Sequence, residues 1–210
     1  MGTSVLVLGH SGSGKSTSLR NFEPGTVGVF SCASKPLPFR RKLDVVPTKS
    51  YGTIMQALQR NARKCFVIDD ANYLMQFENF AKAKDNGYGK FIDMALHFEQ
   101  LLEAANGTDE DTTVYFLMHF DRQDDGYIKP KTIGRMLDEK LCVEGMFPIV
   151  IQAVRDEGGY AFLVQGEVNS PIKAPMGMFE QPRIDNDLAA VDTIIREYNG
   201  CKPLTAEKEG

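Results

Sequence analysis

Short, continuous runs of apolar residues recur along the chain, separated by turn residues or by stretches with helical periodicity. Runs of this kind that end at glycine or polar residues are typical of strands buried on both faces. They cover Ser4–Leu8, Val27–Ser31, Cys65–Ile68 and Thr113–Met118, and a shorter strand is expected at Leu43–Val46.

Helical patterns lie between these strands. The predicted helices are Lys15–Phe22, Tyr51–Ala62, Tyr73–Ala83 and Lys90–Ala105. Ser50 can cap the second of them, in which Ile54, Met55 and Leu58 share one side. Strands that alternate with helices in this way favour a parallel sheet with helices on both faces.

The last third of the chain follows a different pattern, which predicts antiparallel pairs. Asp125-Gly126 indicates a hairpin in which Tyr127–Ile128 pairs back, and Glu157-Gly158-Gly159 separates a second pair of strands, Ile149–Arg155 and Tyr160–Gln165. We also expect a helix at Arg135–Leu141 and a last helix that Asn186 caps, which runs through Tyr198 and stops at Gly200.

The predicted fold class is therefore α/β: a three-layer fold with a parallel sheet and C-terminal antiparallel hairpin additions. One domain covers residues 1–201, and residues 202–210 form a flexible tail. The 210 residues, 42% of them apolar and 25% charged, fit one soluble domain. No apolar run approaches the roughly 20 residues of a membrane helix, which excludes the integral membrane class. Four widely separated cysteines predict free thiols rather than zinc ligands or disulfides.

Charge is distributed unevenly along the chain. The net charge is −4, yet the segment from Lys35 to Lys64 holds eight basic residues and one acid, Asp44. The eight, here called the basic island, are Lys35, Arg40, Arg41, Lys42, Lys49, Arg60, Arg63 and Lys64. A concentration of cations in an acidic chain favours an anionic partner.

The segment Gly9–Ser16 fits the phosphate-binding pattern G-x-x-x-x-G-K-[ST] without a mismatch. Its glycines let backbone N–H groups approach phosphates, Lys15 would bridge the β- and γ-phosphates, and Ser16 would offer its hydroxyl to Mg²⁺. An apolar strand precedes the loop and a helix follows it, as these mechanics require. The residues expected to bind the nucleotide, ATP, are Gly9, Ser11, Gly12, Ser13, Gly14, Lys15, Ser16 and Thr17.

Two carboxylates follow the third apolar run, at Asp69 and Asp70. We assign Asp69 to the Mg²⁺ side of the site, together with Ser16. Asp70 stands where related ATPases usually place the glutamate that activates the attacking water. Aspartate is one methylene shorter, so we expect either slow hydrolysis or an indirect role in which Asp70 does not contact the reacting water.

Further catalytic candidates follow the fourth run. In P-loop ATPases with an extra strand between the phosphate-loop strand and the carboxylate strand, a polar residue at its end lies beside the γ-phosphate, and His119 is the candidate here. Transfer of a phosphoryl group also needs a cation, often from a neighbouring subunit, and Lys129, Lys131 or Arg135 could supply it.

With these motifs in this order, the chain resembles small RecA-like P-loop ATPases of bacteriophages and prophages, usually labelled AAA-domain or ATP-binding proteins. Some of these act as single-strand annealing recombinases beside a single-stranded-DNA-binding protein. The segments Lys35–Pro38, Ala174–Phe179 and Ile184–Leu188 also look like that family.

The resemblance implies a three-layer P-loop NTPase fold whose core is a RecA-like parallel sheet. It also implies that the protein binds ATP with Mg²⁺ and that its copies assemble in a ring or filament. The expected location is the cytoplasm of a bacterial host cell. Lys129 and Lys131 are spaced like the paired lysines that RecA-type proteins place across the subunit interface. Asp70 departs from the RecA pattern, which has glutamate.

Three functions fit these patterns. The first is an oligomeric ATPase that binds single-stranded DNA through residues of the basic island and one aromatic ring: Lys35, Phe39, Arg40, Arg41 and Lys42. The second is a kinase of a small molecule or nucleotide, although no dense arginine lid is evident. The third is an assembly module that senses ATP without hydrolysing it.

Overall fold

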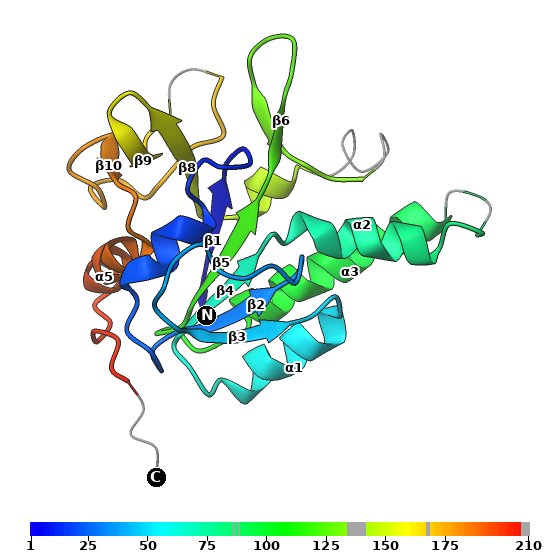
Figure 1. The fold of residues 1–210 in the computed structure, drawn as a ribbon, viewed down its shortest axis with the longest axis horizontal. Coiled ribbons are helices and arrows are strands. Elements are labelled where there is room, and N and C mark those ends of the chain that lie inside the picture. The colour runs from blue at the N-terminus through cyan, green and yellow to red at the C-terminus, as the bar shows by residue number, and fades with distance from the viewer. Residues whose placement is uncertain (86, 88, 134–141, 167–168, 207–210) are drawn as a thin grey trace.

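Eight strands form one mostly parallel sheet at the centre of the fold (Figure 1). The structure is a computed structural model, and it describes all residues except 86, 88, 134–141, 167–168 and 207–210. The strands of this sheet are β1 (Thr3–Leu8), β2 (Gly28–Ser31), β3 (Asp44–Pro47), β4 (Cys65–Asp69), β5 (Thr113–Met118), β8 (Ile149–Asp156), β9 (Gly159–Leu163) and β10 (Arg183–Asp185).

The order of the strands in the sheet is β10-β9-β8-β1-β5-β4-β2-β3. The six strands from β8 to β3 are parallel, and β9 pairs antiparallel with both β8 and β10. A separate hairpin joins β6 (Phe120–Arg122) to β7 (Ile128–Pro130) across Asp125-Gly126. The predicted fold class is confirmed, including the antiparallel additions; β10 has no counterpart in the sequence-based prediction.

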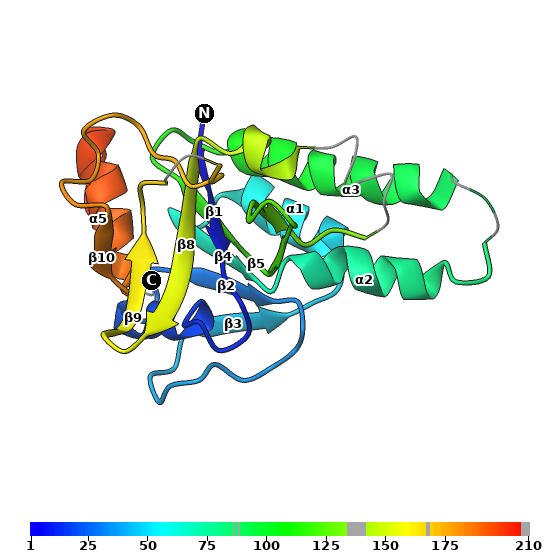
Figure 2. The ribbon, with the colours of Figure 1, turned by 90° about the horizontal axis from the view of Figure 1, so that it is seen from above.

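Helices cover both faces of the sheet (Figure 2). They are η1 (Ser16–Asn21), α1 (Tyr51–Arg60), α2 (Asn72–Ala81), α3 (Gly89–Asn106), η2 (Val143–Met146) and α5 (Leu188–Tyr198). Successive side chains of a strand point to opposite faces of the sheet, so each strand contributes to two core layers. In β1, Leu6 and Leu8 pack in the layer under α1, α2 and α3. Val5 and Val7 pack in the layer under η1 and α5. No helix among the described residues combines the length and apolar composition needed to cross a membrane.

Two helix predictions need correction. The segment after the phosphate loop forms a 3₁₀-helix rather than an α-helix. Its three consecutive hydroxyl residues are weak helix formers, the Ser18 hydroxyl bonds the Lys15 carbonyl at 2.6 Å, and Pro24 stops the helix soon afterwards. The last helix is capped by Asp187, whose carboxylate accepts from the amides of Ala189 and Ala190, not by Asn186. The predicted helix at 135–141 lies outside the described residues.

A buried polar cluster anchors α5 to the sheet. Asp192 accepts a hydrogen bond from the Tyr115 hydroxyl at 2.9 Å and one from Arg196 Nε at 2.6 Å, and all three side chains are almost fully buried. The Arg196 guanidinium also donates to the carbonyls of Lys64, Asp111 and Lys202. Leu204, beyond the helix, lies against the same core layer.

We expect Asp192→Ala to destabilise the protein by about 3–5 kcal/mol, because it leaves the buried Arg196 charge without its carboxylate. Tyr115→Phe removes one hydrogen bond and keeps the ion pair, so its expected cost is about 1–2 kcal/mol. Urea unfolding of the three proteins measures both values. Equal losses for the two variants would contradict the assignment of the ion pair as the main contribution.

Candidate active site

The candidate site lies where three neighbouring parallel strands end. Because β5 lies between β1 and β4, their carboxyl ends bring together the loop Gly9–Lys15, the pair Asp69 and Asp70, and His119. A pocket of about 230 Å³ is lined by these groups and by Lys35. The predicted position of β5, between the phosphate-loop strand and the carboxylate strand, is confirmed.

The phosphate loop needs its glycines for two different reasons. Gly12 and Gly14 have φ angles of +77° and +97°, which side chains of L residues disfavour. A Cβ at Gly14 would also lie 2.7 Å from the Tyr160 ring, and a Cβ at Gly9 would lie 2.3 Å from the Ser13 hydroxyl. The backbone thus packs too closely here for a larger residue.

Lys15 folds over the loop that carries it. Its Nζ donates to the carbonyls of Gly9 at 2.7 Å and His10 at 3.0 Å, and only 5% of the residue is exposed. Burial lowers the pKa of Lys15 to about 8, although the nearby Asp70 and Asp69 favour its charged form. The ammonium group is therefore held at the floor of the pocket with little water around it.

Ser16 and Asp69 form the oxygen-rich side of the pocket. The Ser16 hydroxyl donates to both carboxylate oxygens of Asp69, at 2.8 and 3.0 Å. Burial, reinforced by the charge of Asp70, raises the pKa of Asp69 to about 6. A carboxylate and a hydroxyl in contact are ligands that Mg²⁺ accepts alongside phosphate oxygens. The residues therefore fit the predicted ion, and the buried Ser13 hydroxyl, which lacks a partner among the described residues, fits a polar ligand in the loop.

Asp70 has an unusual backbone conformation and two cationic or polar neighbours. Its φ of +58° is left-handed, which is uncommon outside glycine and is frequent at functional sites. One carboxylate oxygen lies 3.3 Å from His119 Nε2 and the other 3.2 Å from Lys35 Nζ. Burial by itself would raise the pKa of Asp70, but the hydrogen bonds and charges of His119 and Lys35 outweigh it and lower the pKa, so the group is ionised.

His119 links Asp70 to Lys15. Its Nδ1 lies 3.5 Å from Lys15 Nζ, and its Nε2 lies 3.3 Å from an Asp70 carboxylate oxygen. The Asn72 amide oxygen accepts from the His119 backbone N–H at 3.2 Å and fixes the end of the strand. The structure thus places His119 between Asp70 and Lys15, and its role beside the γ-phosphate stays a prediction.

Lys35 is the site residue that the sequence analysis assigned to another role. It lies in the loop after β2, and its side chain reaches across to Asp70 and over the Tyr73 ring, with 5.1 Å between Nζ and the ring centroid. The structure therefore places Lys35 at the phosphate pocket, with its side chain still exposed; its predicted contact with DNA stays a prediction. Only its contacts with residues distant in sequence reveal this position.

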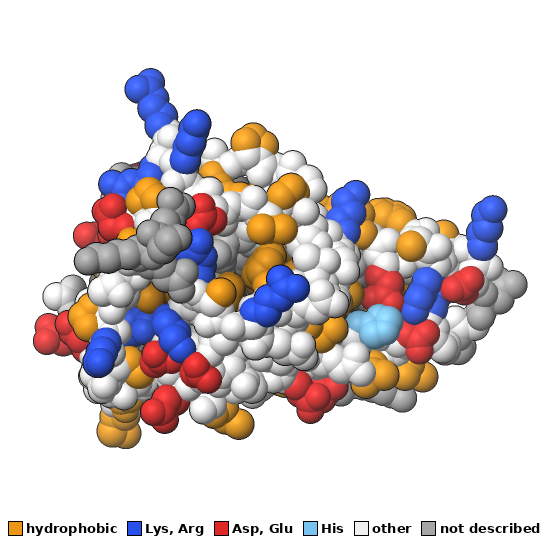
Figure 3. Space-filling view, turned by 90° about the horizontal axis from the view of Figure 1, so that it is seen from below, with side chains coloured by type: hydrophobic (Ala, Val, Ile, Leu, Met, Phe, Trp, Pro, Cys, Tyr) orange, Lys and Arg blue, Asp and Glu red, His pale blue; other side chains and the backbone are white. Residues whose placement is uncertain are grey.

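Carboxylates neutralise part of the basic island. Four of its members pair with carboxylates. They are Lys35 with Asp70, Arg41 with Glu23, Arg63 with Asp44, and Lys64 with Asp109 and Asp111. In the face that Figure 3 shows, Lys and Arg side chains alternate with acidic ones. Phe39 packs against the core under α5, so stacking on a base would require it to leave that contact. Arg40 and Lys42 are exposed.

The predicted interface cations lie on the β6–β7 hairpin, which projects from the sheet in Figure 1. Lys131 pairs with Asp121 at 3.1 Å, and Lys129 lies opposite Asp121 in the hairpin register. Arg135 lies outside the described residues. A role for any of them in a neighbouring subunit stays a prediction.

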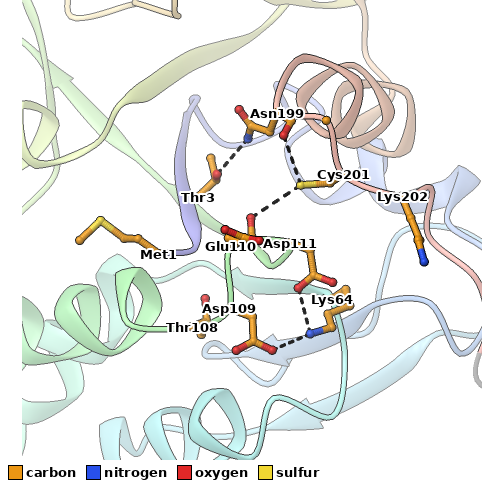
Figure 4. Close-up of a pocket in the computed structure, with 11 residues that line it drawn as sticks. Met1, Thr3, Lys64, Thr108, Asp109, Glu110, Asp111, Asn199, Cys201 and Lys202 are labelled. Atoms are coloured by element: carbon orange, nitrogen blue, oxygen red, sulfur yellow. Dashed lines mark hydrogen bonds and ion pairs between the residues drawn. The ribbon is translucent and has the colours of Figure 1, made fainter.

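A larger cavity, of about 980 Å³, lies at the opposite end of β1 (Figure 4). Its polar groups pair with one another: Lys64 with Asp109 and Asp111, at 2.8 and 2.9 Å, and Asn199 with Thr3 at 3.2 Å. These contacts tie the C-terminal end of α5 to the base of the sheet. These polar groups of the cavity therefore stabilise the fold.

Comparisons with known proteins find likenesses among solved structures only. No family model matches the chain, and no curated protein does. Among solved structures, the chain is similar to the X-ray structure of the Legionella pneumophila ATPase DotB, with a TM-score of 0.35 and 14% sequence identity. The alignment covers 96% of this chain and 53% of that one, so the chain spans about half the length of DotB. The P-loop NTPase fold of the chain rests on its own strand order and phosphate loop.

Proposed function

We propose that this protein is a Mg²⁺-dependent ATPase. The observation that supports the proposal most strongly is the convergence of Lys15, the Ser16–Asp69 pair and the ionised Asp70 in one pocket at the ends of adjacent strands. ATP hydrolysis needs a loop that binds the phosphates, oxygen ligands for the metal ion, and a carboxylate that activates the attacking water. Their proximity comes from the fold, since Asp69 and Lys15 lie far apart in the sequence.

Each group has a distinct task in this proposal. Loop amides and Lys15 bind the β- and γ-phosphates, and Asp70 takes a proton from the attacking water while His119 keeps its carboxylate in position. Water oxygen bonds to the γ-phosphorus as the bond to the β–γ bridging oxygen breaks, and ADP leaves. Ser16 and Asp69 would hold Mg²⁺, which when bound neutralises charge on the phosphates.

Phosphate release distinguishes this proposal from its alternatives. Purified protein with ATP and Mg²⁺ is expected to release phosphate without any acceptor. A strict requirement for an acceptor molecule would favour a kinase, and tight ATP binding without turnover would favour an assembly module that senses ATP. A protein that neither binds nor hydrolyses any purine triphosphate would overturn the proposal.

The proposal extends to single-stranded DNA as the partner, and the family resemblance supports this step. It also extends to an assembly of copies in which Lys129 or Lys131 of one copy reaches the active site of the next. The test is ATP turnover alone, with single-stranded DNA and with duplex DNA, at about 50 mM salt and again at higher salt. Stimulation by single-stranded DNA that fades with salt is the expected result. Absence of binding at low salt would remove DNA from the proposal.

A further inference from the structure

Lys35 is held so that its backbone is fixed while its side chain can turn. Ser34 before it has a left-handed φ of +53°, Pro36 after it restricts its backbone, and its carbonyl accepts from the Ser31 hydroxyl at 3.3 Å. The Lys35 side chain is 62% exposed, whereas the Asp70 carboxylate that it pairs with is 11% exposed. The ammonium group can therefore leave Asp70 without unfolding the loop.

The pocket gives the Lys35 ammonium a second partner close to the first. Lys35, Lys15 and Asp70 line the same space as the loop glycines Gly12 and Gly14, which would bind phosphates. A γ-phosphate in this space would bring more negative charge than Asp70 does. A flexible lysine is a suitable group to exchange between two anions, because its three N–H donors have no fixed orientation.

We propose that Lys35 is a second cation for the terminal phosphate, supplied by the same chain, and that it moves from Asp70 to the γ-phosphate when ATP binds. The inference rests on the proposed function and adds to it. The exchange would do two things: it would stabilise the negative charge of the transferred group, and it would free one oxygen of Asp70 to accept a proton from water. ADP lacks the γ-phosphate, so with ADP bound the Lys35–Asp70 pair would persist.

The test uses titration calorimetry to compare the affinities for two nucleotides, both with Mg²⁺. One is ADP, and the other is the non-hydrolysable ATP analogue in which nitrogen replaces the β–γ bridging oxygen. Lys35→Ala is expected to weaken binding of the analogue about tenfold and to change ADP binding less than about twofold, while kcat for ATP falls about 10- to 100-fold. Lys35→Arg keeps the charge and should recover part of the loss. Lys49→Ala is the matched control, since Lys49 lies over the Phe77 ring outside the pocket.

Four results would overturn the inference. Equal loss of ADP and analogue affinity would make Lys35 a general electrostatic contact, and unchanged affinities with wild-type kcat would give it no role. A faster Lys35→Ala enzyme would make the pair with Asp70 a brake instead. A wild-type protein that binds neither nucleotide overturns the proposed function as well, so the two failures are distinguishable.

Discussion

Lys15→Ala is expected to abolish ATP turnover, with a loss of at least about 100- to 1000-fold in kcat/KM. Lys15 is the one ammonium group in the described part of the pocket that is buried within the phosphate loop itself. Lys35 cannot replace it, because the Lys15 ammonium lies against the loop carbonyls of Gly9 and His10, whereas Lys35 belongs to another loop and contacts Asp70. Initial rates of phosphate release with saturating Mg²⁺ measure the loss.

The same substitution should leave the fold intact. Lys15 donates two hydrogen bonds to loop carbonyls, but its pKa is lowered to about 8, which means that folding costs free energy while the group is charged. The two effects oppose each other, so we expect the free energy of unfolding to change by less than about 2 kcal/mol. Urea unfolding checks this, and Lys49→Ala is the control for loss of one positive charge. Wild-type turnover in folded Lys15→Ala protein would contradict the nucleotide assignment.

The parts of the fold and site that follow local rules were predictable from the sequence. β1, β4 and β5 are buried on both faces, so their apolar runs are continuous and easy to recognise. Phosphate binding requires particular residue types at fixed positions of the loop, so the motif can be recognised from the sequence alone. Asp69 and His119 could be placed because parallel strands carry their last residues to one edge.

The errors concern contacts between distant segments. Asn186 and Asp187 are both good helix caps; Arg20 hydrogen-bonds the Asn186 side chain and carbonyl, which leaves Asp187 to cap α5. The charge count of the basic island left out the carboxylates that other segments supply, because a count along the sequence cannot include them. Lys35 shows this most clearly, since Asp70 lies 35 residues away.

Asp70→Asn is expected to retain nucleotide binding and to lose turnover by about 10²- to 10⁴-fold, the usual contribution of a general base. Asparagine has the same shape and tolerates the left-handed φ of +58° better than most residues, so the backbone at the end of β4 should not move. The amide cannot take a proton from water. Single-turnover measurements of phosphate formation separate this chemical step from binding.

Nucleotide affinity in the same variant gives an independent reading of the site. Asparagine releases Lys35 from its ion pair, so Asp70→Asn should bind the non-hydrolysable ATP analogue more tightly than wild type relative to ADP, as long as Lys35 is present. In Asp70→Asn combined with Lys35→Ala that gain should disappear. Asp93→Asn, which removes a carboxylate that pairs with Lys82 away from the pocket, is the control and should hydrolyse ATP normally. If Asp70→Asn hydrolyses ATP at the wild-type rate, another group activates the water, and His119 is the remaining basic side chain close enough to be tested next.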